Sequence, residues 1–340
     1  AFLTLTSPAN TASGSTFPKG TTMVNWKVAD ASNNMAVCDF TITVNDAENP
    51  AISCPANITK FTDLHLCTAV VTYAMPTSSD NCSVGSTVLT SPANTASGSA
   101  FNKGATTVSW KATDGSGNMA VCNFTVTVTD GQAPTITCPL NQTKSTDPGG
   151  CTAVATYAAT ATDNCAPLPT VTMQSGIPSG MPFPKGTTTV VMKATDEAGL
   201  TKTCTFRVTV NDNELPTISC PGSQSVNTTS NACSSAVVSY ALPTASDNCG
   251  PTPTVARVSG PASGSTFPKG ITNVVWRATD ASANIKTCSF SVTVTDNTPP
   301  AITCPPSMAI TAAPGQCSAA ATYASPTATD NCAIASVILI

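Results

Sequence analysis

The chain has 340 residues, of which 9% are charged, and its formal net charge at neutral pH is −4. This composition excludes the basic footprint of a nucleic-acid-binding protein and the blocks of like charge that form interaction tails. The longest apolar run, residues 333–340 (AIASVILI), is strand-sized and far short of the roughly 18 residues of a membrane helix.

A phrase of 20 residues, STFPKGTTMVNWKVADASNN from Ser15, returns with small changes from Ser99, Met181 and Ser265, at steps of 84, 82 and 84 residues. Self-similarity at a fixed period marks a chain of repeated modules. A period near 84 is too long for a solenoid coil and suits a small all-β domain. The predicted modules are residues 1–46, 47–130, 131–212, 213–296 and 297–340, of which the first and last are partial.

The complete module 47–130 predicts the elements of the others in chain order. Strands are expected within 51–61, 67–76, 83–92, 106–114 and 120–130, the last two joined by a tight GSGN turn. Apolar and polar residues alternate along them, and no helical periodicity of useful length occurs. Short strands with a turn signal every 8 to 12 residues indicate an immunoglobulin-like β-sandwich. We therefore predict an all-β chain of tandem sandwich modules arranged end to end.

The repeated phrase supplies residues for the core and for one turn of each module. Its aromatic residues are expected in the core, with Met192 replacing tryptophan once: Phe17, Phe101, Phe183, Phe267, Trp26, Trp110 and Trp276. The lysines of its KG turn are expected to be solvated: Lys19, Lys103, Lys185 and Lys269.

Sixteen cysteines recur at four positions of the module. In module order the first series is Cys54, Cys138, Cys220 and Cys304, the second Cys67, Cys151, Cys233 and Cys317, the third Cys82, Cys165, Cys249 and Cys332, and the fourth Cys38, Cys122, Cys204 and Cys288. Fixed positions predict two disulfides per module and an extracellular location, with any secretory signal removed or outside this chain. Zinc is disfavoured because no CxxC pair occurs and the chain has one histidine, His65, expected in an exposed loop.

Five motifs in fixed order make the chain resemble the hyalin repeat (HYR) family over essentially its whole length. They are PxIxCP from Pro134, ATDNC from Ala161, FPKGTTTV from Phe183, KATDxSGN from Lys111 and CxFxVxV from Cys122. The resemblance implies an immunoglobulin-like sandwich in extracellular, adhesive or surface proteins, and it implies no catalytic activity.

The resemblance also implies a disulfide pairing. Simpler members of the family have only the first- and fourth-series cysteines, which implies Cys54–Cys122, Cys138–Cys204 and Cys220–Cys288. The remaining cysteines would then pair within modules as Cys67–Cys82, Cys151–Cys165 and Cys233–Cys249. Four cysteines allow three connectivities, and strand geometry alone also supports Cys54–Cys82, so this alternative stays open.

Three recurring aspartates in each module predict a calcium site at the module's N-terminal pole. They lie in the linker, in the DNC motif and at the end of the penultimate strand: Asp46, Asp80 and Asp114; Asp130, Asp163 and Asp196; Asp212, Asp247 and Asp280. Carboxylates, backbone carbonyls and Asn81, Asn164 or Asn248 would supply the oxygen ligands that Ca²⁺ prefers. The alternative is that the aspartates only accept hydrogen bonds in turns. No other cofactor is required. Glycosylation is a separate prediction at Asn57, Asn123, Asn141 and Asn227.

The two partial modules raise the question of assembly. Residues 1–46 correspond to the last strands of a module and residues 297–340 to the first strands, with an overlap of about six residues in the third strand. The chain is either a window of a longer array, or copies of it complete one another head-to-tail.

Two functions follow from this reading. The first is a structural subunit or segment of an extracellular fibre, filament or surface stalk, without enzyme activity. The alternative is a cell-surface adhesin whose repeat loops bind a glycan or cell-surface ligand. Few exposed aromatic or arginine anchors favour the structural function. The sequence predicts no nucleic-acid partner and no membrane span in this chain.

Overall fold

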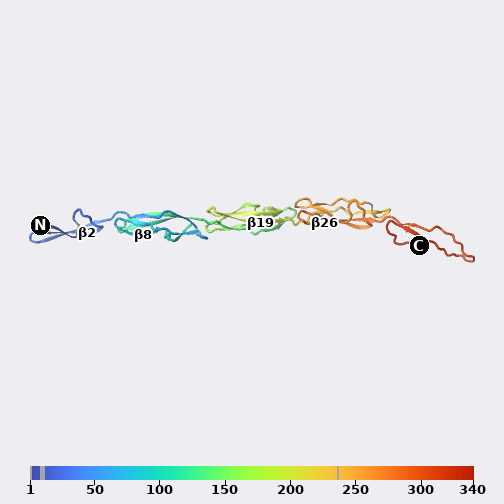
Figure 1. Ribbon diagram of the computed structural model, residues 1–340, viewed down its shortest axis with the longest axis horizontal. Helices are drawn as coiled ribbons and strands as arrows, with labels where there is room; N and C mark the ends of the chain where they lie inside the picture. The colour runs from blue at the N-terminus through green and yellow to red at the C-terminus, as the bar shows by residue number, and fades with distance from the viewer. Residues whose placement is uncertain (1, 8–11, 236) are drawn as a thin grey trace. The chain divides into compact units, whose positions relative to one another are not determined.

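The computed structural model describes residues 2–7, 12–235 and 237–340, and every regular element in these ranges is a β-strand (Figure 1). The predicted all-β fold is therefore confirmed. By internal contacts the chain divides into two compact units. One consists of Ala1–Cys138, Ala159–Gln174 and Val191–Cys204, and the other of Pro139–Ala158, Ser175–Val190 and Thr205–Ile340.

Module 47–130 contains eight strands. They are β4 (Ala51–Ser53), β5 (Ile58–Phe61), β6 (Thr68–Val71), β7 (Thr77–Ser79), β8 (Val84–Ser91), β9 (Ser99–Asn102), β10 (Gly104–Asp114) and β11 (Met119–Thr129). The main sheet has the order β5-β11-β10-β8, and the short pairs β4-β7 and β6-β9 complete the module. β10 and β11 pair antiparallel from Gly104↔Val128 to Thr113↔Met119, whereas β5 pairs parallel to β11.

The next two modules follow this plan, except that in module 213–296 two isolated bridges, Ser234 to Pro268 and Val238 to Ser265, take the place of the β6-β9 pair. Their strands are β12 (Thr135–Thr137), β13 (Gln142–Ser145), β14 (Thr152–Val154), β15 (Thr160–Thr162), β16 (Thr170–Ser175), β17 (Pro182–Pro184), β18 (Gly186–Thr195), β19 (Thr201–Asn211), β20 (Thr217–Ser219), β21 (Gln224–Thr229), β22 (Ala232–Ser235), β23 (Thr244–Ser246), β24 (Thr254–Ser259), β25 (Gly270–Thr279) and β26 (Ile285–Thr295). Their main sheets have the orders β13-β19-β18-β16 and β22-β21-β26-β25-β24.

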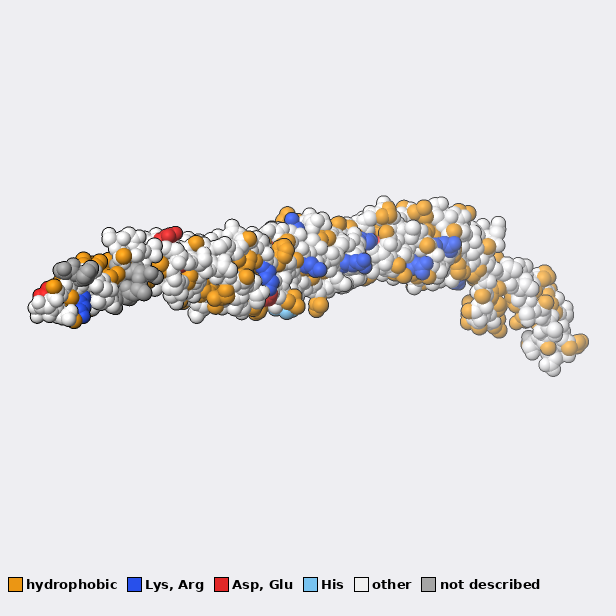
Figure 2. Space-filling model, turned by 60° about the vertical axis from the view of Figure 1, so that its left-hand side comes forward, with side chains coloured by type: hydrophobic (Ala, Val, Ile, Leu, Met, Phe, Trp, Pro, Cys, Tyr) orange, Lys and Arg blue, Asp and Glu red, His pale blue; other side chains and the backbone are white. Residues whose placement is uncertain are grey.

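The alternating residues of the long strands form the cores. Val108, Trp110, Val126 and Val128 point to one side of β10 and β11 and are at most 4% exposed. The aromatic residue of the repeated phrase is buried in each complete module, at Phe101, Phe183 and Phe267, as the sequence predicts. On the face seen in Figure 2, hydrophobic side chains form scattered spots, and Lys and Arg lie in separate small groups.

The two partial modules have only part of this structure. β1 (Phe2–Ser7), β2 (Gly20–Ala29) and β3 (Met35–Val44) form one sheet, and β27 (Ala301–Thr303) pairs with β28 (Thr327–Thr329). Both leave core positions open. Phe40 is 46% exposed where its equivalent Phe124 is 3% exposed, and Tyr323 is 55% exposed where Tyr73 is 9% exposed.

Candidate functional site: the module junctions

The side chains singled out by the sequence converge at four junctions between modules. Each junction is built around the linker aspartate that follows the last long strand of a module. We number the junctions by these aspartates: first Asp46, second Asp130, third Asp212 and fourth Asp296. Each junction lies within one of the two compact units.

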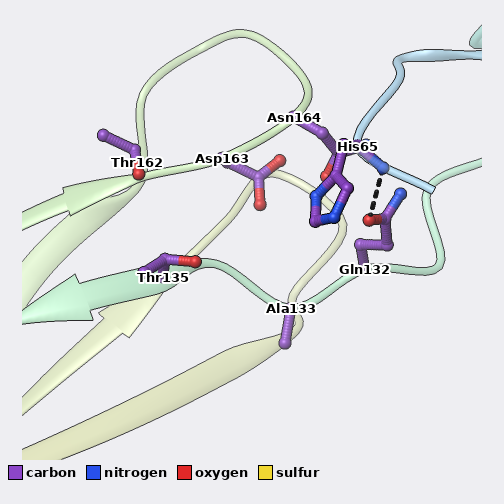
Figure 3. Close-up of a pocket in the computed structure, with 7 residues that line it drawn as sticks. All are labelled: His65, Gln132, Ala133, Thr135, Thr162, Asp163 and Asn164. Carbon is purple, nitrogen blue, oxygen red and sulfur yellow. Dashed lines mark hydrogen bonds between the residues drawn. The ribbon is translucent and has the colours of Figure 1, made fainter.

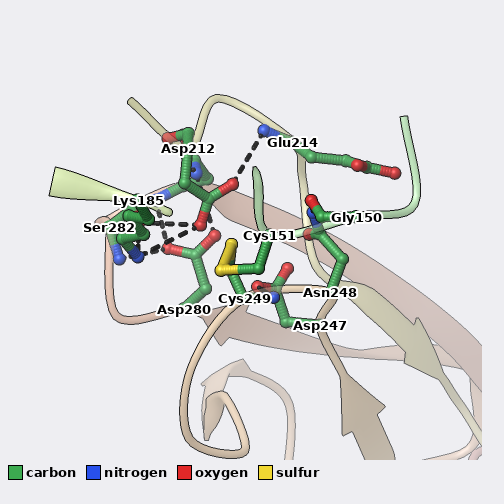
Figure 4. A network of polar contacts seen from close by, with 11 residues as sticks. Gly150, Cys151, Lys185, Asp212, Glu214, Asp247, Asn248, Cys249, Asp280 and Ser282 are labelled. Carbon is green, nitrogen blue, oxygen red and sulfur yellow. Dashed lines mark hydrogen bonds and ion pairs between the residues drawn. A yellow bond between two sulfur atoms is a disulfide. The ribbon is translucent and has the colours of Figure 1, made fainter. Parts of the chain in front are cut away.

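At the third junction, side chains from two modules meet on Asp212 (Figure 4). Lys185 Nζ lies 3.3 Å from Asp212 Oδ2, and Ser282 Oγ donates to the same oxygen at 2.8 Å. Asn284 Nδ2 donates to the Asp212 backbone carbonyl at 3.1 Å, and the Asp212 side chain is fully buried. The KG turn of one module and the TDxSxN turn of the next therefore both bind the linker aspartate, one through an ion pair and the other through hydrogen bonds.

The lysines of the KG turns form ion pairs at the junctions and stay in contact with solvent: Lys19 and Lys269 are exposed, as expected, and Lys103 and Lys185 are half-buried. Lys19 pairs with Asp46 at 3.2 Å and Lys269 with Asp296 at 3.1 Å. At the second junction Lys103 instead pairs with Glu197 at 2.6 Å, which raises the pKa of Lys103. Sequence reasoning missed these pairs because the partners lie 27 or more residues apart. A KG lysine 27 residues before the linker aspartate recurs in all four repeats and was the available signal, although Lys103 pairs with Glu197 instead.

The TDxSxN turn is organised by its own aspartate. Asp280 Oδ1 accepts hydrogen bonds from the backbone N–H groups of Ser282 and Asn284, both at 2.8 Å, and Oδ2 accepts from Asn284 Nδ2 at 2.9 Å. Burial acts to raise the pKa of Asp280, but these donors outweigh it and lower the pKa below its usual value. Asp114 makes the same contacts in its module, and its pKa is lowered for the same reasons.

Two series of disulfides are present. Cys54–Cys122, Cys138–Cys204 and Cys220–Cys288 lie within modules, as the family resemblance implies. The second- and third-series cysteines pair between adjacent modules instead, as Cys67–Cys165, Cys151–Cys249 and Cys233–Cys332. The expected pairs Cys67–Cys82, Cys151–Cys165 and Cys233–Cys249 are therefore wrong, and so is the alternative Cys54–Cys82.

The reason is that these two cysteines lie at opposite poles of a module. The Cys67 carbonyl accepts from the N–H of Lys103, in the turn beside the following linker. The N–H of Cys82 donates to Asp80, which lies beside the preceding linker residue Asp46. A cysteine at one pole can reach only the facing pole of the neighbouring module.

In three of the four DNC motifs, the asparagine donates a hydrogen bond across the junction, next to a disulfide between modules. Asn164 Nδ2 donates to the Leu66 carbonyl at 2.8 Å, Asn248 to Gly150 at 2.6 Å and Asn331 to Thr229 at 2.9 Å. Each bond crosses a junction. The acceptor is the residue before the partner cysteine at the second and third junctions, and the last residue of β21, shortly before Cys233, at the fourth. Asn164 and Asn248 were expected to offer their amide oxygens to Ca²⁺, and these bonds use their nitrogens, so the role of the oxygens stays a prediction.

The predicted aspartate triads are brought together at two junctions. Oxygens of Asp46, Asp80 and Asp114 lie within 4.8 Å of one another, as do those of Asp212, Asp247 and Asp280. At the second junction the corresponding group is Asp130, Asp163 and Cys165, so Asp196 is not part of it, and Cys165 is committed to its disulfide. At the first and third junctions a lysine ammonium already contacts the linker carboxylate.

His65 lies at the second junction (Figure 3). As expected it is exposed and in a loop, where its N–H donates to Gln132 Oε1 at 2.9 Å, and Gln132 Nε2 donates to the Asp63 carbonyl at 3.0 Å. A hollow of about 310 Å³ lies between these residues and Asp163 and Asn164. The contacts are structural and tie the linker to the loop before Cys67.

The predicted glycosylation sites Asn57, Asn123, Asn141 and Asn227 are all exposed. Asn57 Oδ1 accepts from the N–H of Thr125 at 2.7 Å, and Asn141 Oδ1 accepts from that of Arg207 at 2.8 Å. Glycosylation at these sites stays a prediction. Within the described residues, no helix is long and apolar enough to cross a membrane.

Comparison with known proteins gives a family and several relatives. The HYR domain model matches residues 4–44, 45–128, 129–210, 211–294 and 295–340. A hyalin of Strongylocentrotus purpuratus is 33% identical over 330 residues, covering 93% of this chain and 27% of the relative. A hyalin of Lytechinus variegatus is 32% identical over 337 residues, covering 96% of this chain and 62% of the relative.

A third relative is the mouse Sushi, von Willebrand factor type A, EGF and pentraxin domain-containing protein 1. It is 31% identical over 170 residues, covering 50% of this chain and 5% of the relative. The chain thus spans less than two thirds of each of these relatives. With five consecutive matches that cover nearly all of its residues, the chain belongs to the HYR domain family.

Proposed function

We propose that this chain is a structural segment of an extracellular fibre, filament or surface stalk, in which disulfide-linked HYR modules bear tension. Its similarity to the hyalins and its six disulfides support an extracellular, adhesion-related repeat protein. The observation that carries the load-bearing role is the overlap of the three disulfides between modules.

These disulfides shorten the covalent path along the chain. From Cys67 the path crosses to Cys165, returns 14 residues to Cys151, crosses to Cys249, returns 16 residues to Cys233 and crosses to Cys332. It therefore has 30 residue steps, in place of the 265 steps of the backbone between Cys67 and Cys332. If only the disulfides within modules were present, the shortest path from Cys67 to Cys332 would contain four backbone stretches. They run from Cys67 back to Cys54, from Cys122 to Cys138, from Cys204 to Cys220 and from Cys288 to Cys332, which are 13, 16, 16 and 44 steps, or 89 steps in all.

At roughly 3.3–3.6 Å per extended residue, 30 steps span about 100 Å and 265 steps about 900 Å. Tension would therefore be transmitted by two short covalent segments and three disulfides, even where a module has lost its fold. Such a chain resists extension more than its hydrogen bonds alone would allow.

Single-molecule stretching tests the proposal, with handles on unnatural residues at the exposed positions Leu66 and Ala333. Replacing the six cysteines of the disulfides between modules by serine should lengthen the limiting extension by about 200 Å, because the shortest path between the handles grows from 32 to 89 residue steps. The matched control replaces the six cysteines of the disulfides within modules and should leave the limiting extension unchanged. Equal extensions for the wild type and the first variant would contradict a load-bearing role.

We also propose that two copies of the chain can assemble head-to-tail, residues 297–340 of one completing residues 2–46 of the other. The support is the open core of each part, with Phe40 and Tyr323 about half exposed. Sedimentation of a variant with Cys38, Cys82, Cys304 and Cys317 replaced by serine should show concentration-dependent association. Phe40→Asp should abolish it, whereas Phe61→Asp, on the exposed side of a complete module, should not. A monomer at every concentration would refute the proposal.

We further propose that Ca²⁺ binds the aspartate triads of the first and third junctions. Asp80 Oδ2 and Asp247 Oδ1 are buried without a hydrogen-bond partner, and carboxylate oxygens are ligands that Ca²⁺ favours. Because Lys19 and Lys185 compete for the linker carboxylates, binding should be stronger in Lys19→Met and Lys185→Met. Calorimetric titration should detect binding that Asp247→Asn weakens. No heat of binding in either lysine variant would contradict the proposal.

A further inference from the structure

The lysine of the KG turn and the linker aspartate form a recurring pair that is shielded from water on its acidic side. At the third junction Lys185 Nζ lies 3.3 Å from Asp212 Oδ2, and the Asp212 side chain is completely buried. At the first junction Lys19 Nζ lies 3.2 Å from Asp46 Oδ2, and 1% of the Asp46 side chain is exposed. Each pair therefore holds a primary amine against a carboxyl group that bulk water does not reach.

We propose that these two pairs condense to amide (isopeptide) bonds, one between Lys185 and Asp212 and the other between Lys19 and Asp46. A bond forms between Nζ of the lysine and Cγ of the aspartate, and the bond from Cγ to Oδ2 breaks. One ammonium and one carboxylate thus become one neutral amide and one water molecule, and no oxidant or activating group is consumed. In chains that carry the bond, the linker residue offers Ca²⁺ an amide oxygen in place of a carboxylate, which agrees with the stronger binding expected for Lys19→Met and Lys185→Met. This inference goes beyond the proposed load-bearing function and does not depend on it.

The two oxygens of Asp212 lie in different surroundings, and both suit this reaction (Figure 4). Oδ1 accepts a hydrogen bond from the N–H of Glu214 at 3.2 Å, and it would remain as the amide oxygen. A backbone N–H there stabilises the negative charge that develops on this oxygen when an amine attacks the carboxyl carbon. Oδ2 lies beside Lys185 Nζ and accepts from Ser282 Oγ at 2.8 Å, so it is the oxygen that would leave as water.

Asp247 supplies a group that can move the protons. Its Oδ1 is buried without a hydrogen-bond partner among the described residues, and oxygens of Asp247 and Asp212 lie within 4.8 Å of each other, a separation that one water molecule can bridge. Asp280 lies equally close, but both of its oxygens accept hydrogen bonds within its own turn. Asp247 would therefore take a proton from the Lys185 ammonium, which makes the amine nucleophilic. It would deliver the two protons that the ammonium loses, one after the other, to the departing Oδ2.

The first junction repeats the arrangement of the third. The N–H of Glu48 donates to Asp46 Oδ1 at 3.2 Å, and Ser116 Oγ donates to Asp46 Oδ2 at 3.5 Å. Asp80 Oδ2 is buried and has no hydrogen-bond partner in the part of the chain that the structure describes. Oxygens of Asp46, Asp80 and Asp114 lie within 4.8 Å of one another. A lysine amine, a shielded carboxyl group and a carboxylate oxygen free to carry a proton therefore occur together at both junctions.

Proximity makes the condensation feasible at these two junctions. Groups held in reacting contact within one molecule reach effective concentrations of about 10⁵–10⁸ M. Because the Asp212 side chain is completely buried, solvent has little access to the amide once it has formed. The second junction lacks this arrangement, since Lys103 pairs with Glu197, whose side chain is 58% exposed. No amide bond is therefore expected there.

The experiment maps the tryptic peptides of the folded full-length chain by mass spectrometry, after reduction, denaturation and removal of any glycans. Trypsin does not cleave after a lysine whose Nζ is part of an amide. We therefore expect one branched peptide that joins Lys185 to Asp212 and another that joins Lys19 to Asp46, each lighter than its two parts by one water molecule. The intact chain should accordingly be lighter than its sequence by two water molecules.

Three variants test the roles of the residues. Lys185→Arg keeps the positive charge, but its guanidinium stays protonated and is not a nucleophile, so only the Lys185 branched peptide should disappear. Asp247→Asn keeps both reacting groups and removes the proton acceptor, so it should lower the yield of the same peptide. Lys103→Arg, at the second junction, is the matched control and should leave both branched peptides unchanged. The Cys138–Cys204 disulfide, mapped without reduction, reports that the substituted module has folded.

The wild-type chain by itself can refute the proposal. If Lys185 and Asp212 appear only in separate peptides and the intact mass equals that of the sequence, the pairs are ion pairs and the proposal is wrong. A branched peptide that persists in Lys185→Arg would show that another lysine is the nucleophile, which overturns the assignment. An undiminished yield in Asp247→Asn would keep the bond and exclude Asp247 from its formation.

Discussion

Asp280 shows how a single residue can build a local turn and prepare a junction. Its carboxylate holds the N–H groups of Ser282 and Asn284, and this places their side chains on Asp212 of the linker. The sequence predicted an aspartate with either a metal-binding or a turn-capping role, and the hydrogen bonds show the capping role. The equivalent turn at Asp196 has Leu200 in place of the asparagine, so it has no side-chain amide to offer the linker.

Asp280→Asn tests the charge on this turn. The folded-state pKa of Asp280 lies below the ordinary value of about 3.9, so its stabilisation is present above about pH 4 and is lost as the pH falls through the folded pKa. The melting temperature of the variant should therefore be below that of the wild type at neutral pH and approach it near pH 2. Asp39→Asn, at an exposed carboxylate, should show no such convergence. A difference that is constant with pH would contradict this assignment.

Tyr240→Phe tests a second recurring residue. The Tyr240 hydroxyl donates to the Pro261 carbonyl at 2.7 Å in a largely buried setting. Its removal should lower the unfolding free energy of the module by about 1 kcal/mol, measured by urea denaturation. Tyr323→Phe is the matched control, because Tyr323 is 55% exposed, and it should leave monomer stability unchanged. Equal effects of the two substitutions would argue against the hydrogen bond as the cause.

At the scale of elements, the chain that follows β24 passes close to the next long strand, β25. Gly260 follows β24 with φ of +86°, and a Cβ there would lie 2.8 Å from the Asn273 carbonyl oxygen of β25. Gly176 has the same approach to Val190 in the preceding module. The alternating residues predicted the strands themselves, but this close approach depends on how two strands lie side by side.

Gly260→Ala should therefore destabilise its module by about 2 kcal/mol or more, because it adds backbone strain to a clash with β25. Gly222→Ala is the control, since no atom lies within 4 Å of its Cβ position and its φ is ordinary. It should be neutral or slightly stabilising, by up to about 1 kcal/mol. Urea denaturation of both variants measures the difference, and similar stabilities would refute the predicted clash.

At the scale of the whole molecule, the disulfides between modules couple the stability of neighbours. Removing Cys151–Cys249 by serine substitution of both residues should lower the unfolding free energy of the adjoining modules by about 2–4 kcal/mol. It should also split a shared melting transition, because the two modules would then unfold separately. Differential scanning calorimetry measures both effects. Cys304→Ser, which removes no disulfide within one chain, should change neither, and an unsplit transition in the double variant would contradict the coupling.

The sequence by itself determined the period, the long strands, the aromatic core positions of the complete modules and the family. These features depend on local alternation and on repetition, and both can be read without knowing how the chain folds back on itself. The disulfides within modules also followed, although from the family resemblance and not from the spacing of the cysteines.

Only the tertiary structure decided what joins one module to the next. Whether Cys67 lies at the same pole as Cys82 or at the opposite pole depends on the path of the strands between them, and residue spacing does not specify that path. The ion pair of Lys103 with Glu197 and the hydrogen bond of Asn248 to Gly150 likewise connect residues 94 and 98 positions apart. Contacts between modules form where two poles meet, so their partners could not be read from the pattern of any single repeat.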